Sequence, residues 1–283
     1  MEFKEIADIR GVSFKPRIRP FRVVSLVPSW TETLFYLGLT ELELVGRTDY
    51  CIHPRARVDT VERLGGPKDP DLDRIFELDP DLIIMDREEN REVDVERLDM
   101  HWGVSRAFLT GPTTVDQALS SVEGIGLLLD VEHCASELIS NVRSLRKGLI
   151  KRDRGSVVYL TWQDPFIAAT RETYIGDVLE LLGYKNILDR SSVKRLKKGG
   201  NEKYPVVDLA LLARLSPKAI FLSTEPFPFR RKHIVRLRSE LRQFDTQYAE
   251  KVDIRIVNGE YFSWYGSRMI AAFRYFVKNQ ARP

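Results

Sequence analysis

Apolar residues along this chain occur in short runs separated by stretches with helical spacing. The first third carries several such runs, each bounded by proline, glycine or charged residues, which predicts buried strands. These predicted strands are Arg22–Val27, Leu44–Arg47, Asp81–Met85 and Val104–Leu109. Helical patterns lie between them, and the alternation of strand and helix predicts a parallel sheet with helices on both faces.

The helices of this first part are predicted from their end signals. After Pro28, Ser29 can cap a helix, and Glu32 stands three residues later at the spacing of a capping box. Gly38 predicts the end of that helix. A further helix is predicted over Asp71–Leu78, where the pattern stops before a proline.

The middle of the chain carries a longer helical pattern. Leu138, Val142, Leu145 and Leu149 fall on one face, which predicts a helix of about 22 residues over Val131–Arg152, or ~33 Å. Beyond it the alternation resumes. Strands are predicted at Ser156–Thr161, Ala219–Ser223 and Ile254–Asn258, and helices at Ile175–Leu182, Val207–Leu215, Ile234–Phe244 and Ser267–Asn279.

These elements divide the chain into four parts. They are an N-terminal arm (1–21), an α/β lobe (22–125), a connecting helix (126–153) and a second α/β lobe (154–283). The predicted fold class is α/β, with two Rossmann-like lobes joined by one long backbone helix. Open α/β sheets bind ligands beyond the carboxyl ends of their strands, so we expect a ligand in the cleft between the lobes.

Composition excludes several classes of protein. Hydrophobic residues make up 43% and charged residues 30%, and the formal charge is only +3, which favours a globular protein over a nucleic-acid-binding one. No window reaches the ~18 apolar residues that would cross a membrane. One basic run, Lys194–Lys198 before Gly199 and Gly200, is either a solvated loop or a contact for an anionic partner.

The N-terminal residues and the two cysteines indicate in which cellular compartment the protein is expected. Glu2, Lys4 and Glu5 stand where a secretory signal would need an apolar core, so we expect a cytoplasmic protein; a longer natural precursor would instead be periplasmic. Cys51 and Cys134 are too few for a disulfide framework, and both are expected to be reduced.

Several segments carry a family resemblance. Val23–Gly38 has a strand, Pro-Ser and Thr-Glu before a helix, and Asp69–Met85 has an acid-Arg-Ile motif followed by Leu-x-Pro-Asp-Leu-Ile. Asp177–Ile187 has leucines before Gly and Asn-Ile, and Val207–Phe221 has helix, proline and strand. In this order they resemble the periplasmic-binding-protein family for vitamin B12 and ferric siderophores, over about residues 20–278. Tyr50–Pro54, Glu88–Arg91 and Glu260–Met269 resemble a leaderless, cobalamin-binding-like subgroup.

The resemblance implies a class III substrate-binding-protein architecture and non-enzymatic binding of a corrinoid or related metal chelate between the lobes. Tyr50, Tyr204 and Tyr261 match aromatic ligand positions, whereas Gly66 and Asp86 stand where secreted B12 receptors carry tryptophan. It also implies an ABC permease as partner. The acidic residues that would contact the permease are Asp73 and Asp208.

The loops after the predicted strands bring flat aromatic side chains towards one opening, which suits a large planar ligand. Candidates for ligand contact are Trp30, Tyr50, Glu88, Trp162, Tyr204, Tyr261, Trp264 and Arg268. Trp30 and Trp162 could equally cap the core, and Glu88 could be the solvated start of a helix. Trp264 is predicted to lie at a loop tip and to face the cleft from the lobe opposite His53.

Cys51 and His53 are candidate metal contacts. Thiolate and imidazole bind borderline-soft metals, and a corrinoid cobalt accepts an axial imidazole. Residues two apart in an extended loop point the same way, so both could face the ligand. In the alternative interpretation, His53 is a hydrogen-bonding loop residue and Cys51 a small buried one.

No catalytic motif is present: the sequence lacks a Gly-x-Ser-x-Gly elbow, His-Glu-x-x-His, Cys-x-x-Cys and a P-loop. We therefore expect a binding protein with neither catalytic residues nor a catalytic cofactor. One alternative is a ferric-siderophore or haem receptor of an ABC importer, which would group basic residues such as Arg47, Arg91 and Arg268. The other is a cytoplasmic chelatase or corrinoid-handling enzyme that uses His53 with Glu88.

Overall fold

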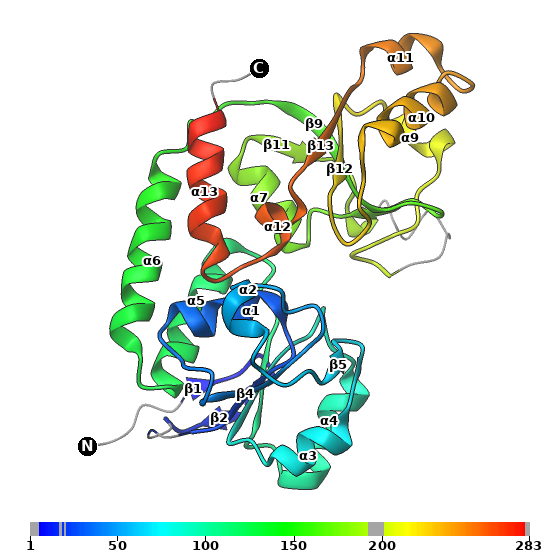
Figure 1. Cartoon of the computed structure of the whole chain (residues 1–283). Coiled ribbons are helices and arrows are strands. Elements are labelled where there is room, and N and C mark those ends of the chain that lie inside the picture. The colour runs from blue at the N-terminus through cyan, green and yellow to red at the C-terminus, as the bar shows by residue number, and fades with distance from the viewer. Residues whose placement is uncertain (1–5, 17–18, 20, 192–200, 281–283) are drawn as a thin grey trace. The chain divides into compact units, whose positions relative to one another are not determined.

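A computed structural model describes residues 6–16, 19, 21–191 and 201–280. The basic run Lys194–Lys198 lies outside the described residues. The chain forms two compact units, each with its own sheet (Figure 1). Unit 1 comprises Met1–Pro112, Asp116–Ser144 and Trp264–Ala271, and unit 2 comprises Thr113–Val115, Leu145–Ser263 and Ala272–Pro283.

Unit 1 is built on a parallel sheet of strand order β4-β3-β7-β8. Its strands are β3 (Val23–Ser25), β4 (Leu44–Arg47), β7 (Leu82–Asp86) and β8 (Ala107–Thr110). Two antiparallel pairs accompany this sheet: β1 (Ile6–Ala7) with β2 (Ser13–Phe14), and β5 (Gly65–Gly66) with β6 (Asp69–Pro70). The helices are α1 (Pro28–Tyr36), α2 (Arg55–Val58), α3 (Leu72–Leu78), α4 (Glu92–Trp102) and α5 (Val115–Leu128).

One face of this sheet packs against α3 and α4. Ile83 and Met85 on β7 are fully buried, and they share a core cluster with Ile75 of α3 and Leu98 of α4. Each fully buried aliphatic side chain stabilises the fold by roughly 1.5–3 kcal/mol relative to an exposed one. This packing holds the carboxyl ends of the parallel strands along one edge, where the loops that follow them carry polar and aromatic residues.

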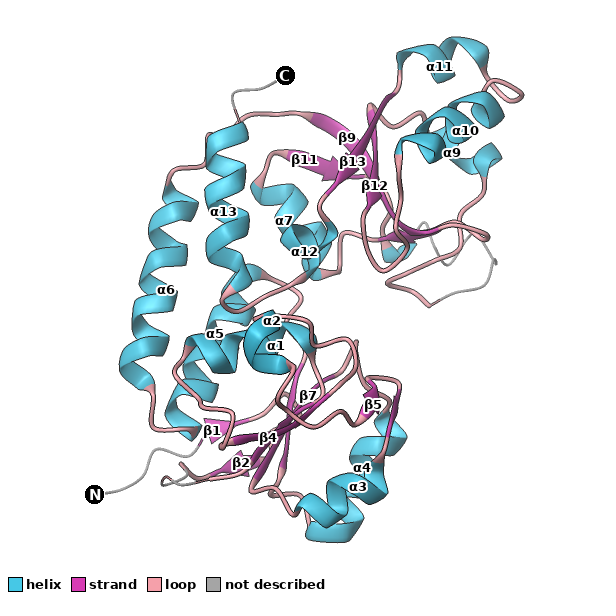
Figure 2. Ribbon diagram, viewed as in Figure 1, coloured by secondary structure: helices cyan, strands magenta, loops and turns pink. Residues whose placement is uncertain are grey.

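Unit 2 contains a second sheet of order β10-β9-β12-β13, with β11 also paired to β9 (Figure 2). The strands are β9 (Gly155–Trp162), β10 (Ile167–Ala169), β11 (Tyr184–Asn186), β12 (Ala219–Ser223) and β13 (Asp253–Val257). All pairings are parallel except the hairpin of β9 with β10. The helices are α7 (Tyr174–Leu181), α9 (Leu209–Leu215), α10 (Arg231–Leu241), α11 (Thr246–Lys251) and α12 (Gly259–Ser263).

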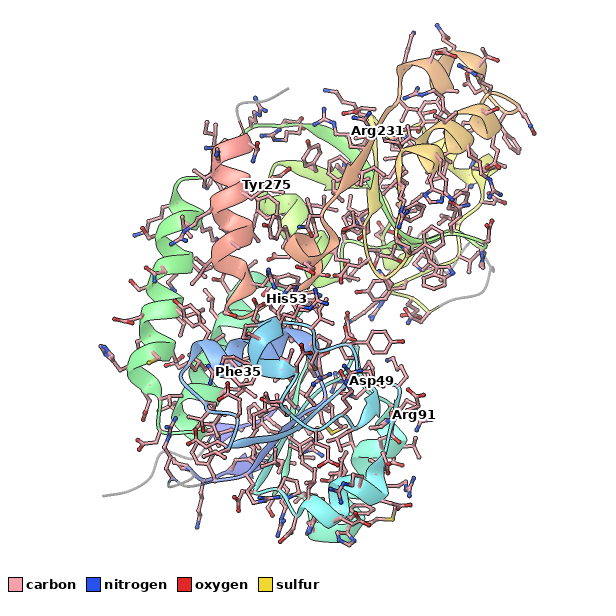
Figure 3. The ribbon with its side chains drawn as sticks, viewed as in Figure 1. Phe35, Asp49, His53, Arg91, Arg231 and Tyr275 are labelled. Atoms are coloured by element: carbon pink, nitrogen blue, oxygen red, sulfur yellow. The ribbon has the colours of Figure 1, made fainter. Side chains whose placement is uncertain are left out.

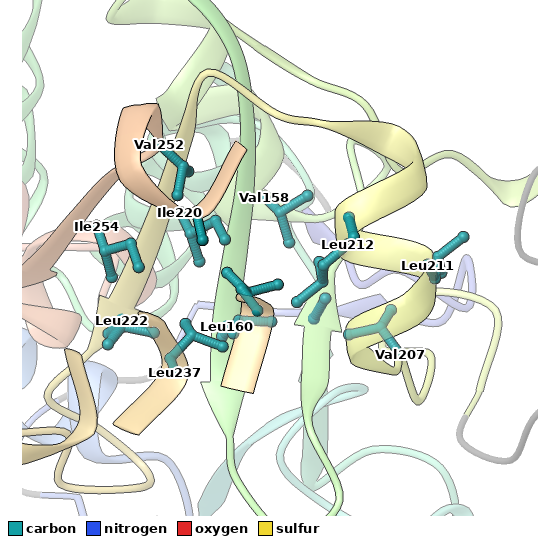
Figure 4. Close-up of a cluster of buried hydrophobic side chains, with 14 of the residues drawn as sticks. Val158, Leu160, Val207, Leu211, Leu212, Ile220, Leu222, Leu237, Val252 and Ile254 are labelled. Atoms are coloured by element: carbon teal, nitrogen blue, oxygen red, sulfur yellow. The ribbon is translucent and has the colours of Figure 1, made fainter. Parts of the chain in front are cut away.

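A buried aliphatic cluster fixes α9 and α10 on this sheet (Figure 4). Alternate residues of β9 and β12 point to the same face, because side chains of a strand repeat every second residue. They are Val158, Leu160, Ile220 and Leu222, and they pack with Leu212 of α9 and Leu237 of α10. The carboxyl ends of β9 and β12 therefore lie side by side at one edge of the unit.

The α/β class and the strands predicted at Leu44–Arg47 and Ala219–Ser223 are confirmed residue for residue. The long helix is shorter than predicted: α6 spans Glu132–Lys147, 16 residues, within the interval 126–153. It ends before Gly148, a residue with low helix propensity. α6 and the last helix, α13 (Arg268–Asn279), each contribute residues to both units. Among the described helices, none is long and apolar enough to cross a membrane.

The predicted capping box of the first helix is wrong. α1 starts at Pro28 with Val27 as its N-cap residue, and no side chain caps it. Proline is favoured at the first helical position because it lacks the N–H that a cap would satisfy. Ser29 consequently lies inside the helix, and Glu32 is left to make a different contact.

The predicted N-terminal arm includes an ordered hairpin. Asp8 is buried, and its carboxylate accepts hydrogen bonds from Arg10 Nε (2.7 Å), Val12 N (3.1 Å) and Leu109 N (3.2 Å). Phe14 packs edge-on against Phe108 at 5.2 Å. These contacts make residues 6–14 part of unit 1.

Asp8→Ala should therefore lower the free energy of unfolding by roughly 2–4 kcal/mol, because it removes a buried carboxylate with several donors. Urea denaturation measures the change. The matched control is Asp73→Ala in the exposed first turn of α3, for which we expect a loss of under about 1 kcal/mol. Equal losses in the two variants would show that the hairpin is a loosely attached arm.

Candidate ligand-binding site

The loop after β4 presents two exposed side chains at the carboxyl edge of unit 1. Tyr50 is 64% exposed and Ile52 is 51% exposed, while His53 is half-buried. Asp49 and His53, near the two ends of this loop, are labelled in Figure 3. The Tyr50 ring lies beside Gly66, where an added Cβ would come 3.6 Å from Tyr50 Cε2.

Cys51 points the opposite way from its neighbours. Its Sγ atom lies 3.0 Å from Thr31 Oγ1 and 3.1 Å from Thr48 Oγ1 inside the core. Burial raises the pKa of the Cys51 thiol, so it stays neutral, whereas metal binding needs the thiolate. In the described part of the chain, no group of three or more His, Cys, Asp or Glu side chains could hold a metal ion. A metal contact at His53 remains a prediction.

The imidazole ring of His53 packs against the indole ring of Trp264. The ring centroids are 5.6 Å apart and the planes meet at 73°, an edge-to-face contact. Trp264 is 9% exposed and belongs to unit 1, like His53. The expectation of an exposed loop tip on the opposite lobe is therefore wrong: the residues after α12 return to unit 1 and bury this indole beneath the loop.

An ion pair anchors the other side of the indole. The Arg268 guanidinium lies over the Trp264 ring, with its Cζ 5.4 Å from the ring centroid. Its Nε and Nη2 lie 2.9 and 2.8 Å from the two carboxylate oxygens of Glu32. The Nε hydrogen bond and the second close ion-pair contact hold the guanidinium beside Glu32. Glu32, Arg268, Trp264 and His53 thus form one chain of contacts from α1 to the surface loop.

The cavity beside Arg268 has a volume of about 230 Å³ and is also lined by Phe35, Tyr36 and Arg57. Ligand pockets usually measure about 300–1,000 Å³, so this space is too small for a corrin or porphyrin ring. The exposed loop after β4 differs from this cavity, because it presents open apolar surface in Tyr50 and Ile52.

Beneath the same edge lies a buried polar network centred on Asp86. Its carboxylate accepts hydrogen bonds from Thr110 Oγ1 (2.7 Å), Glu88 N (2.8 Å) and the Tyr265 hydroxyl. Trp30 is fully buried, and its Nε1 donates to Thr110 Oγ1 at 2.8 Å. Burial raises the pKa of Asp86. Trp30 is therefore a core residue, which is one of the two outcomes that its sequence position allowed.

The other sequence candidates in unit 1 lie around this edge. Glu88 is half-buried, and its backbone carbonyl accepts from Lys68 Nζ at 2.6 Å. Asp73 is exposed on α3. In unit 2, the Asp208 carboxylate caps α9 by accepting from Leu211 N at 2.8 Å. Docking of these two acidic residues to a permease remains a prediction.

Unit 2 places further aromatic side chains at its own carboxyl edge. Trp162, at the end of β9, is 39% exposed and meets Phe227 edge-on at 5.6 Å. Tyr204 is half-buried. Tyr261 packs against Tyr275 of α13 at 5.3 Å, within the same unit. The structure thus pairs Trp162 with a residue, Phe227, that the sequence had not marked as a candidate.

The basic residues proposed as a group are separate. Arg47 is 1% exposed and donates to the carbonyls of Val58 and Thr48, Arg91 pairs with Asp94 at 2.8 Å, and Arg268 pairs with Glu32. A different basic group, Arg230, Arg231 and Lys232, lies exposed beside Phe227. The sequence pattern that could have indicated this group is Phe-Pro-Phe-Arg-Arg-Lys at residues 227–232, shortly after a buried strand.

Comparison with known proteins decides the family. A family described as "Periplasmic binding protein" matches residues 23–243, well over half of the chain. The chain belongs to the periplasmic binding protein family. The family and its solved members are solute-binding proteins and not enzymes, which leaves the chelatase alternative without support.

Individual relatives of this periplasmic binding protein are distant. A vitamin B12-binding protein of Vibrio campbellii is 22% identical over 206 residues, 71% of this chain and 70% of that one. The solved periplasmic vitamin B12-binding protein of Vibrio cholerae superimposes with a TM-score of 0.72 at 18% identity, over 93% of this chain and 98% of that one. A periplasmic haem-binding protein of Roseiflexus gives 0.71 at 19%, over 92% and 97%. These likenesses show the predicted class III fold.

The burial of Trp264 predicts that Trp264→Ala lowers the free energy of unfolding by roughly 3–5 kcal/mol, as for other large-to-small core changes. Trp162→Ala, which truncates a partly exposed tryptophan, should cost under about 1.5 kcal/mol. Urea denaturation of both variants provides the comparison. If the Trp264 variant were as stable as the Trp162 variant, the indole would not support the loop.

The two free cysteines should differ in reactivity. At neutral pH a thiol reagent should modify half-buried Cys134 in the native protein and leave Cys51 until the protein unfolds, because the Cys51 thiol is buried and its pKa is raised. A Cys134→Ser variant isolates the slow thiol. Equal native rates for the two cysteines would contradict the placement of Cys51.

Proposed function

We propose that this periplasmic binding protein is a non-enzymatic receptor for a planar metal chelate, with a corrinoid as the first candidate. The observation that carries the proposal is the loop after β4. It exposes Tyr50 and Ile52 at the carboxyl edge of the sheet and holds His53 against Trp264. An exposed aromatic and an exposed aliphatic side chain on one short loop offer apolar contact to the flat face of a ring.

The single imidazole of His53 is a suitable ligand for a metal ion that a chelating ring already holds. A bare zinc ion needs three or four protein ligands, and the described residues contain no such group. A corrin or porphyrin supplies the equatorial ligands itself, so a single imidazole is enough to complete an axial position. His53, in contact with Trp264, is the residue that we propose for this ligand.

Contacts within unit 1 hold His53 in its orientation. Trp264 is packed below His53, and Arg268 and Glu32 fix Trp264 from the other side. A side chain held in its bound orientation loses little conformational entropy when the ligand arrives. The relatives agree with this class of ligand, since one binds vitamin B12 and a structural neighbour binds haem.

Haem is the second candidate. The observation that favours it is the basic group Arg230, Arg231 and Lys232 beside the Trp162–Phe227 pair of unit 2. Haem carries carboxylates that would pair with such cations, whereas the side chains of most corrinoids end in neutral amides.

Titration of the purified protein with hydroxocobalamin, cobinamide and ferric haem, followed by absorption spectroscopy, tests the function. At least one ring should bind with a stoichiometry of one. Tyr50→Ala should weaken that binding by about five- to 150-fold, the effect of losing a stacking contact worth ~1–3 kcal/mol. The control is Tyr36→Ala on α1, where the ring is 48% exposed, and it should bind as the wild type does.

His53 is tested separately by the same spectra. His53→Ala should shift the metal-dependent absorption bands of the bound ring, because an axial imidazole is lost, while Trp264→Phe should keep them near their wild-type positions. Failure of all three rings to bind the wild-type protein would refute the proposed function. Unchanged bands in the His53 variant would limit His53 to a structural role.

A further inference from the structure

The outward face of α4 exposes two large apolar side chains. The inner face of this helix packs into unit 1 through Val95 and Leu98, which are 5% and 1% exposed. On the opposite side, Val93 and Met100 are 48% and 78% exposed. They are seven residues apart, about two helical turns, so they lie on one face. Apolar side chains aligned on the open face of an ordered helix indicate a contact for another molecule.

Two charged side chains lie between these apolar ones. Glu96 and Arg97 are exposed, and in the described part of the chain neither has an ion-pair partner. They cannot neutralise each other, because neighbours in sequence point in different directions from a helix. In contrast, the buried Asp94 of the same helix pairs with Arg91 at 2.8 Å. The outward face therefore offers one acid and one base to a partner.

This face is complementary to itself when two copies of α4 run antiparallel. About a two-fold axis, residue i of one copy faces residue j of the other, and j faces i. An axis that passes between residues 96 and 97 places Glu96 opposite Arg97 of the second copy. The same axis places Val93 opposite Met100. Each group thus meets its complement in an identical chain.

A third pair has the same symmetry. The axis places the exposed Glu92 opposite His101 of the second copy. The His101 ring is already held in place, because it stacks on Phe76 with centroids 4.1 Å apart. An imidazole N–H can donate to a carboxylate, so this pair extends the polar contacts to both ends of the helix.

We infer that the outward face of α4 is an interface with a second copy of this chain, in which two α4 helices pack antiparallel about a two-fold axis. Val93 and Met100 cover each other at two symmetry-related places, and two Glu96–Arg97 ion pairs form across the axis. One pair of helices buries less surface than the roughly 1,600 Å² of a standard interface. The dimer is therefore reversible, with a dissociation constant in the micromolar range. The inference goes beyond the proposed function and does not depend on a ligand.

Sedimentation velocity of the full chain without ligand tests the interface. The wild type should change from monomer to dimer as its concentration rises through the micromolar range. Glu96→Arg places arginine opposite arginine, and Arg97→Glu places glutamate opposite glutamate, so each variant alone should dimerise at least tenfold more weakly. An equimolar mixture of the two variants should dimerise again, because every arginine of one copy then faces a glutamate of the other. Both positions are exposed, so circular dichroism should show an unchanged fold.

Matched controls reverse the same charges on other helices. Glu123 of α5 and Arg143 of α6 are exposed, and Glu123→Arg and Arg143→Glu should dimerise as the wild type does. The inference would be overturned by a wild type that stays monomeric up to submillimolar concentration, or by α4 variants that dimerise as well as the controls. A mixture of the two α4 variants that stays monomeric would also overturn it. None of these results involves ligand binding, so the proposed function stands or fails separately.

Discussion

The contact on which the unit 1 site depends is the close approach of Gly266 to Thr33. Gly266 has a φ of +73°, and a Cβ there would lie 2.0 Å from Thr33 Oγ1, so only glycine fits. The next amide, Ser267 N, donates to Thr33 Oγ1 at 2.9 Å, and this hydroxyl donates in turn to Ser29 O at 2.7 Å. A segment more than 200 residues away in sequence is thereby fixed against α1.

Three consequences for the site follow from this contact. Trp264 comes to lie under His53, Tyr265 reaches the buried carboxylate of Asp86, and Arg268 meets Glu32. Each is a local interaction of modest energy, but together they orient the loop that exposes Tyr50. The loop is therefore packed where His53 contacts Trp264 and open to solvent at Tyr50 and Ile52. That combination suits a receptor, which needs an ordered contact surface but no reacting groups.

Local patterns in the sequence were enough for the strands that form apolar runs, such as Leu44–Arg47 and Ala219–Ser223, and for the family, because its motifs are linear. The two-residue strands β1, β2, β5 and β6 were not predicted, because none of them forms an apolar run. The site was harder, since it depends on which segments meet. Nothing near Trp264 in sequence indicates that it returns to unit 1. Nothing in the sequence indicates that the Cys51 thiol lies beside two threonine hydroxyls in the core rather than on the ligand surface. The sequence alone does not distinguish the roles of Arg47, Arg91 and Arg268. In the structure, each of these arginines contacts a different partner. The basic residues 230–232 were visible in the sequence, but only the structure shows that they are exposed beside Phe227.

The central claim is that the loop at the carboxyl edge of the unit 1 sheet binds a planar metal chelate. Hydrogen–deuterium exchange of the full chain, with and without saturating ferric haem or cobinamide, measures this directly. The account predicts slower exchange of the backbone amides at residues 48–53, after β4, with little change in α3 and α4. Protection confined to other surfaces, or absent from this loop while the ring is bound, would contradict it.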